Sequence, residues 1–210
     1  MDISGPHEPM RQGLLSLLAP KTGHFQFESG HHGNLWLHVN QPFLQPSRLH
    51  PYVVELAKGL SAHGIEGVCG PFIEGAFLAQ MVAAALDVEF FYTERFVLPE
   101  RNALYPVDYR LPNGLRRAVL GKRIAIVDDI INAGSAVRAT FANLRACGAN
   151  PVVVGALLVL GSSASNFFRG QDLPLESLAQ IPNDLWAPAE CPLCAARMPL
   201  DVVTETPGDP

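Results

Sequence analysis

Two adjacent carboxylates are the first candidates for chemistry in this sequence. Asp128 and Asp129 follow the apolar run 124–127. A turn that ends in the small residues Ala133 and Gly134 comes after them, and a helix is predicted to begin at Ser135. The first turn of a helix offers unpaired backbone N–H groups and a partial positive charge, both of which suit a phosphate. Small residues before the helix let a phosphate approach the backbone, so the segment 124–136 is predicted to bind one.

The two carboxylates would repel a phosphate, so they must face another group. The vicinal hydroxyls of a ribose are suitable donors to carboxylate oxygens. A nucleoside triphosphatase is disfavoured, because the turn lacks the lysine of a P-loop. The remaining alternative is that Asp128 and Asp129 only end a strand and cap a helix. The whole segment favours a phosphorylated sugar.

Strands and helices alternate through the middle of the chain. Strands are predicted at residues 24–27, 35–39, 67–70, 88–93, 123–127 and 152–159. Helices are predicted at 10–18, 47–62 with Ser47 as N-cap, 75–86 and 135–147, whereas 95–118 and the last 50 residues look irregular. This order predicts an α/β fold, a Rossmann-like parallel sheet with helices on both faces. Ligands of such sheets bind beyond the carboxyl ends of the strands, where the aspartates lie.

Composition narrows the class of protein. With 210 residues, 48% of them hydrophobic and 17% charged, the chain suits one domain with an appendage. A net charge of −5 without a basic cluster argues against a nucleic-acid partner. The longest apolar stretch, 151–160, is too short to span a membrane, and the N-terminus does not look like a signal peptide. We therefore expect a cytoplasmic protein. The four cysteines do not form a disulfide scaffold.

The segment 127–135, Val-Asp-Asp-Ile-Ile-Asn-Ala-Gly-Ser, resembles the ribose-5-phosphate loop of the type I phosphoribosyltransferases. The residues 25–30 and 35–37 are similar to the amino-terminal hood of the orotate phosphoribosyltransferase family, and 70–75 stand where that family has its pyrophosphate loop. The tail, with Cys191-Pro192-Leu193-Cys194 and then Pro199-Leu200, resembles some bacterial members. The resemblance covers most of residues 10–200.

This resemblance implies the fold, the reaction and the site. A nucleobase would attack C1′ of phosphoribosyl pyrophosphate and release pyrophosphate, with Mg²⁺ held through the substrate and without a direct protein ligand. The implied residues for binding the sugar diphosphate are Asp128, Asp129, Ile130, Ile131, Asn132, Ala133, Gly134, Ser135, Ala136, Phe72, Ile73, Glu74 and Gly75. The implied catalytic residues are Asp128, Asp129 and Arg95, and the implied base-binding residues are Trp36, Leu37 and Asn132. The resemblance also implies a homodimer.

Three departures from the family pattern concern charge. Glu28 stands where the orotate enzymes usually have Lys or Arg, and Glu74 where they have Lys or Gly. Residues 160–162 stand where a base-contacting Arg normally follows the last core strand of the family. Orotate carries a carboxylate, and an unpaired buried anion is costly. Two alternatives to an orotate enzyme therefore stay open: a phosphoribosyltransferase for an uncharged base, and a non-catalytic regulator that binds phosphoribosyl pyrophosphate.

The family's mobile loop corresponds to residues 95–117. Its arginines are candidates to close over the pyrophosphate, although only Arg95 matches the family by position: Arg95, Arg101, Arg110, Arg116 and Arg117. An ordinary solvated loop is the alternative.

Several weaker signals complete the expectations. Cys191 and Cys194 have the spacing of metal ligands, but no second pair follows them, and zinc needs four ligands. His31 and His32 are expected to be exposed turn residues, with ligands or donors near a site as the alternative. Phe72 is either a stacking or a core residue. The expected organisation is a hood at 1–45, a core at 46–170 and a tail at 171–210.

Overall fold

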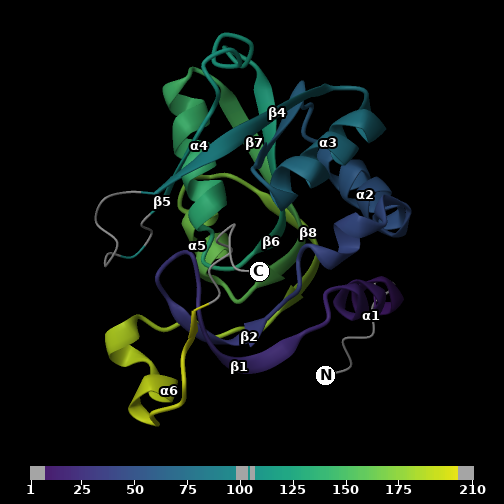
Figure 1. The fold of residues 1–210 in the computed structure, drawn as a ribbon. Coiled ribbons are helices and arrows are strands. Elements are labelled where there is room, and N and C mark those ends of the chain that lie inside the picture. Colours follow the sequence, from purple (N-terminus) through teal and green to yellow (C-terminus); the bar gives the residue numbers. More distant parts are fainter. Residues whose placement is uncertain (1–7, 98–103, 105–106, 203–210) are drawn as a thin grey trace.

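A computed structural model describes residues 8–97, 104 and 107–202 as one α/β body with a smaller sheet beside it (Figure 1). The helices of the body are α1 (Glu8–Leu17), α2 (Pro46–Ser61), α3 (Glu74–Leu86), α4 (Ser135–Ala146) and α5 (Ser163–Arg169). Its strands are β3 (Gly67–Pro71), β4 (Glu89–Val97), β5 (Val107–Arg110), β6 (Arg123–Ile131), β7 (Asn150–Leu160) and β8 (Leu175–Ile181).

The main sheet has the strand order β5-β4-β3-β6-β7-β8. Strands β4, β3, β6, β7 and β8 run parallel, whereas β5 pairs antiparallel with β4. The central strands β6 and β7 are buried almost throughout, as expected for parallel strands covered on both faces. The Rossmann-like prediction is confirmed, and the antiparallel edge strand makes the sheet mixed.

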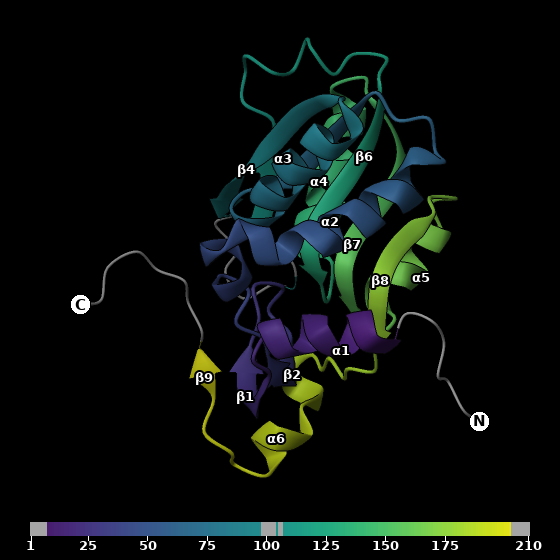
Figure 2. The same ribbon diagram turned by 90° about the vertical axis from the view of Figure 1, so that its right-hand side faces the viewer.

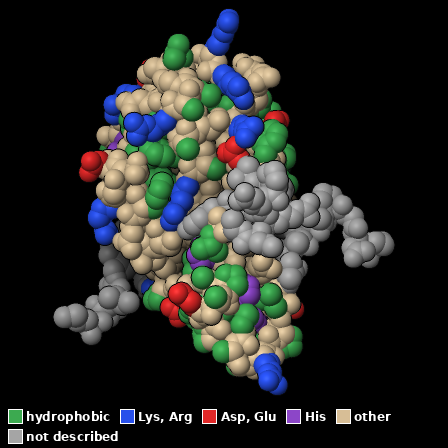
Figure 3. Space-filling model, turned by 90° about the vertical axis from the view of Figure 1, so that its left-hand side faces the viewer, with side chains coloured by type: hydrophobic (Ala, Val, Ile, Leu, Met, Phe, Trp, Pro, Cys, Tyr) green, Lys and Arg blue, Asp and Glu red, His purple; other side chains and the backbone are tan. Residues whose placement is uncertain are grey.

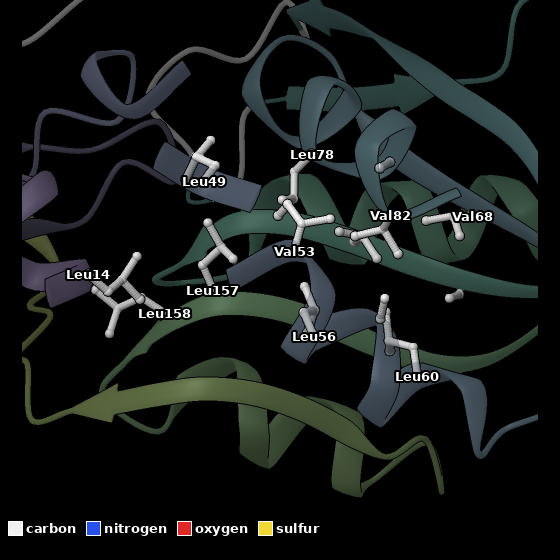
Figure 4. Close-up of a cluster of buried hydrophobic side chains, with 14 of the residues drawn as sticks. Leu14, Leu49, Val53, Leu56, Leu60, Val68, Leu78, Val82, Leu157 and Leu158 are labelled. Atoms are coloured by element: carbon white, nitrogen blue, oxygen red, sulfur yellow. The ribbon is translucent and has the colours of Figure 1, made fainter. Parts of the chain in front are cut away.

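The two faces of the sheet have separate hydrophobic cores. Helices α2 and α3 cover one face and α4 and α5 the other (Figures 1 and 2). The larger core joins α1, α2 and α3 to the sheet, and Figure 4 shows Leu14, Val53, Leu78 and Leu157 converging in it. The second core includes Phe141 and Phe168, whose rings meet edge to face. Two packed faces hold the ends of the central strands in place.

A second sheet forms the hood. It consists of β1 (Lys21–Gln26), β2 (His32–Trp36) and β9 (Asp201–Val202) in the order β2-β1-β9. The short elements η1 (Gln41–Leu44), η2 (Pro188–Glu190) and α6 (Pro192–Ala195) complete the described part. The expected tail, 171–210, therefore supplies β8 to the main sheet and β9 to the hood. In Figure 2 the hood and α6 lie together below the body.

Several local predictions were wrong, among them the strand predicted at 35–39, which is found as β2 at His32–Trp36. Residues 95–118 are not simply irregular, because β4 runs on to Val97 and pairs with β5. The N-cap of α2 is Gln45 rather than Ser47. β6 does not end at Val127 but continues through both aspartates, since its register with β7 is kept as far as Ile131. Among the described helices, none has the length and apolar character needed to span a membrane.

Candidate active site

The two aspartates lie near the carboxyl end of β6, the strand between β3 and β7 in the main sheet. Asp128 pairs in register with Ala156 of β7, so it belongs to the sheet rather than to the turn. The chain turns at 132–134 and then enters α4. The carboxylates and the first turn of α4 therefore lie at the edge of the sheet where such folds bind ligands.

Both carboxylates are buried, at 9% exposure for Asp128 and 8% for Asp129. Asp128 Oδ1 accepts a hydrogen bond from the backbone N–H of Asp129 at 3.2 Å. Asp129 Oδ2 is buried and has no hydrogen-bond partner within the described residues. Burial raises the pKa of Asp128, and the neighbouring Asp129 charge raises it further. Burial also raises the pKa of Asp129, to about 7. A ligand that brings hydroxyl donors would satisfy these acceptors.

The first turn of α4 is open to an anion. Its N-cap is Gly134, which has a φ of 82° and no side chain to cap the backbone N–H groups. The positive φ favours glycine at this point. Asn132 Oδ1 accepts a hydrogen bond from Asn183 Nδ2 at 3.0 Å, which links the turn to the segment after β8. Ile131 and Ala133 have buried side chains, so a ligand would meet their backbone.

Glu28 of the hood reaches into this site. Its carboxylate accepts hydrogen bonds from Ser135 Oγ at 3.2 Å, Tyr109 OH at 3.2 and 3.3 Å, and Arg95 Nε at 2.7 Å. Burial raises the pKa of Tyr109, and the Glu28 charge adds to this rise. The predicted residues Ser135 and Arg95 are thus joined by a carboxylate that lies beside the helix terminus, where an anionic ligand is expected.

The segment 70–75 packs directly against the aspartates. A Cβ at Gly75 would lie 2.4 Å from Asp128 Oδ1, and a Cβ at Gly70 would lie 2.1 Å from the carbonyl oxygen of Gly75. The Phe72–Ile73 peptide bond is cis, and both of these side chains are exposed. The backbone N–H of Phe72 donates to Thr93 O at 2.8 Å. Glycine at 70 and 75 is therefore required for this segment to approach β6.

The predicted base-binding residues lie in or next to the hood. The Trp36 ring stacks on Phe27 with centroids 6.4 Å apart and also contacts Phe25. Leu37 is 5% exposed and belongs to the larger core. His32, which we expected to be exposed, is 4% exposed on β2. The expectation for His32 was wrong because this residue faces the tail.

Among the other arginines of 95–117, two have local partners, one is exposed and one lies outside the described residues. Arg110 Nε donates to Asp108 Oδ2 at 2.6 Å, and Arg116 Nε donates to Leu111 O at 3.3 Å. Arg117 is exposed, and Arg101 lies outside the described part of the chain.

Sequence reasoning missed two residues of the site, Tyr109 and Asn183. Tyr109 is 4% exposed in a stretch that looked irregular. The alternation of Val107 and Tyr109 with polar residues was the available signal for a strand there. Asn183 follows β8 and carried no signal, because only the sheet order brings it to Asn132.

Comparison with solved structures defines the class of this fold. An adenine phosphoribosyltransferase from Trypanosoma brucei, in complex with AMP, pyrophosphate and ribose-5-phosphate, matches with a TM-score of 0.62 and 18% identity, over 85% of this chain and 81% of that one. An orotate phosphoribosyltransferase from Aeropyrum pernix matches with a TM-score of 0.60 and 18% identity, over 83% and 93%. The fold is that of the type I phosphoribosyltransferases.

Sequence comparison identifies the family. The orotate phosphoribosyltransferase of Helicobacter pylori is 33% identical over 190 residues, which cover 84% of this chain and 88% of the relative. A search against models of protein families finds no match. The chain belongs to the orotate phosphoribosyltransferase family.

Proposed function

We propose that this chain transfers ribose-5-phosphate from phosphoribosyl pyrophosphate to orotate and releases pyrophosphate. The observation that carries the proposal is the buried Asp128–Asp129 pair beside the open first turn of α4. Carboxylates with unmet acceptor capacity next to unpaired N–H groups match the hydroxyls and the phosphate of one ligand. Membership of the orotate phosphoribosyltransferase family supports the same reaction.

Each group at the site has a role in this reaction. Asp128 and Asp129 accept from the 2′ and 3′ hydroxyls, and the turn 131–136 binds the 5′-phosphate. The segment 72–75 lies against Asp128, so its backbone is placed to bind the pyrophosphate. Once Arg95 is released from Glu28, its guanidinium stabilises the negative charge that develops on the leaving pyrophosphate. Most of the catalytic effect then comes from positioning and electrostatic stabilisation.

We propose Mg²⁺ as the cofactor, bound through the oxygens of the substrate. The carboxylate oxygens of Asp128 and Asp129 are hard acceptors, which suits an Mg²⁺ ion that keeps its water ligands. Because Asp129 Oδ2 is buried and has no hydrogen-bond partner within the described residues, it can accept a hydrogen bond from one of those waters. Bound Mg²⁺ supplies neutralisation of the diphosphate charge.

A homodimer and a cytoplasmic location belong to the same proposal. The family resemblance supports the dimer. The four cysteines are free, as expected for a reducing compartment.

A non-catalytic sensor of phosphoribosyl pyrophosphate is the second candidate, and Glu28 is the observation in its favour. A carboxylate hydrogen-bonded to both Ser135 and Arg95 competes with substrate for the groups that catalysis needs. A ligand that displaces Glu28 would break these contacts between the hood and the core. The resulting change in the position of the hood could report that the ligand is bound.

Pyrophosphate release distinguishes the candidates. The protein is incubated with Mg²⁺, phosphoribosyl pyrophosphate and, separately, orotate, uracil, hypoxanthine and adenine, while calorimetry measures binding of the sugar diphosphate. Release with orotate alone supports the proposal. Release with another base assigns a different acceptor, and binding without release for every base selects the sensor. A chain that does not bind the sugar diphosphate contradicts the orotate transferase, the transferase for another base and the sensor alike.

A further inference from the structure

Four metal-binding side chains meet at the junction of the hood and the tail, outside the site described above. His24 lies on β1 and His32 begins β2. Cys191 is the N-cap of α6, and Cys194 lies within α6. Their ligand atoms all lie within 4.8 Å of one another. His24, His32 and Cys191 are buried, and Cys194 is exposed. In Figure 3 several His side chains gather among hydrophobic ones on the lower lobe.

The spacing of these atoms is that of a tetrahedral zinc site. Bonds of about 2.0–2.1 Å to nitrogen and about 2.3 Å to sulfur place two nitrogens about 3.4 Å apart, and a nitrogen and a sulfur about 3.6 Å apart. His24 Nε2 lies 3.2 Å from His32 Nδ1, 3.4 Å from Cys191 Sγ and 3.7 Å from Cys194 Sγ. Cys194 Sγ lies 3.2 Å from His32 Nδ1. These four distances lie within a few tenths of an ångström of the tetrahedral values, and the two remaining pairs of ligand atoms lie within 4.8 Å.

The protonation of His24 also suits a metal ligand. Its Nδ1 lies 3.0 Å from the carbonyl oxygen of Met198, which can only accept, so Nδ1 carries the proton. The Nε2 lone pair then faces the other three side chains. A ligating histidine typically donates its second N–H to a carbonyl in this way, which fixes the ring orientation. His32 is buried as well, and its Nδ1 faces His24 Nε2 and Cys194 Sγ.

We propose that His24, His32, Cys191 and Cys194 bind one Zn²⁺ ion that fastens the tail to the hood. Two thiolates and two imidazoles suit zinc, and four protein ligands leave no open position, so the site is structural rather than catalytic. The Cys-x-x-Cys pair of the sequence finds its partners upstream, in the hood, and not downstream. This inference does not depend on the proposed transferase activity.

The tail needs such a fastening. α6 has four residues and β9 has two, which is too short for either to be stable alone. Beyond β9, the backbone contact between tail and hood includes the bridge of His32 with Trp186, with N···O distances of 2.8 and 2.9 Å. The ion would add two coordinate bonds to the hood and two to the tail.

The fastening also bears on the candidate active site. Glu28 lies in the turn between β1 and β2, so His24 and His32 flank it on both sides. Two ligands on one ion hold the base of this turn at a set separation. The zinc site thereby positions the turn that brings Glu28 to Ser135.

Metal content tests the proposal on the whole chain. Protein is expressed with Zn²⁺ in the medium and purified without chelator. Inductively coupled plasma mass spectrometry is expected to find one zinc per chain. Replacing zinc with Co²⁺ is expected to give the visible absorption of a tetrahedral ion together with a thiolate charge-transfer band. Cys191→Ser with Cys194→Ser, and separately His24→Ala, should lose the zinc. Cys147→Ser removes a half-buried thiol of α4's C-terminus and should keep it.

Stability gives a second readout. A strong chelator is expected to lower the Tm of the wild-type chain and of Cys147→Ser, and to leave the double cysteine variant unchanged. If that variant does not fold, the zinc content and the Co²⁺ spectrum of the wild-type chain still decide. Wild-type protein that holds no zinc and gives no thiolate band with Co²⁺ would overturn the proposal. So would a Cys191–Cys194 disulfide in protein purified under reducing conditions, or equal zinc in the double variant.

Discussion

Glu28→Gln is expected to tighten the binding of ribose-5-phosphate. The Glu28 carboxylate accepts from Ser135 Oγ at 3.2 Å, and this hydroxyl belongs to the turn proposed to bind the 5′-phosphate. A phosphate oxygen accepting from the same hydroxyl would lie about 5 Å from the carboxylate. The wild-type chain therefore brings two anions together when the ligand binds, whereas the amide removes one of the charges and keeps the size of the side chain.

Coulomb's law sets the magnitude. In surroundings close to water, two unit charges about 5 Å apart repel by about 0.8 kcal/mol, and a phosphate dianion doubles this value. The Glu28 side chain is 31% exposed, so solvent and salt reduce the repulsion and the water-like value is appropriate. A net effect of about 1–2 kcal/mol corresponds to binding that is roughly 5- to 30-fold tighter. The loss of the half-exposed Glu28–Arg95 ion pair costs about 0–1 kcal/mol of stability.

Isothermal titration calorimetry with ribose-5-phosphate measures this effect without the pyrophosphate. The gain is expected to shrink at high salt, because its origin is electrostatic. Glu94→Gln is the matched control, since it removes the same charge from an exposed position beside Arg95 on β4. Unchanged or weaker binding by Glu28→Gln, or an equal gain in the control, would refute the reasoning.

Three further variants test the site. Asp128→Asn combined with Asp129→Asn should weaken ribose-5-phosphate binding by roughly 2–3 kcal/mol or more, the value of lost charged hydrogen bonds, and unchanged affinity by calorimetry would reject the ribose assignment. Because burial raises the pKa of Asp129 to about 7, the folded chain keeps a proton that the unfolded chain has released, and stability falls as the pH rises from about 4 to 7. Asp129→Asn alone should therefore raise the Tm more at pH 8 than at pH 4, and an equal or opposite change would contradict this sign. Gly70→Ala places a Cβ 2.1 Å from the Gly75 carbonyl oxygen and should cost about 1–3 kcal/mol of stability and weaken pyrophosphate binding. Gly114→Ala meets nothing within 4 Å and should do neither.

Local patterns of the sequence were sufficient for the centre of the fold. The apolar run before Asp128, the small residues after Asp129 and the helix from Ser135 lie within about a dozen positions of one another, and the structure has them in the predicted order. Strand, turn and helix preferences act over such short distances, so they can be read without the rest of the chain. The family resemblance rests on the same segment, and the comparison with relatives confirms it.

The boundary errors came from pairing between strands. The two aspartates look like the end of a strand because their side chains are charged, but β7 continues beside them and keeps β6 in register. The alternation of Val107 and Tyr109 with polar residues is only four residues long, and the antiparallel pairing with β5 extends β4 to Val97. Strand length depends on the neighbour as well as on the segment itself.

The amino-acid sequence by itself determined the strand, the acidic pair and the open helix terminus, because each depends on neighbouring residues. Only the tertiary structure decided which distant groups join them. Glu28 meets Ser135 across 107 positions, and His24 meets Cys191 across 167. Contacts at such separations are set by the order of strands in the two sheets and by where the tail returns to the hood, and no local pattern encodes them.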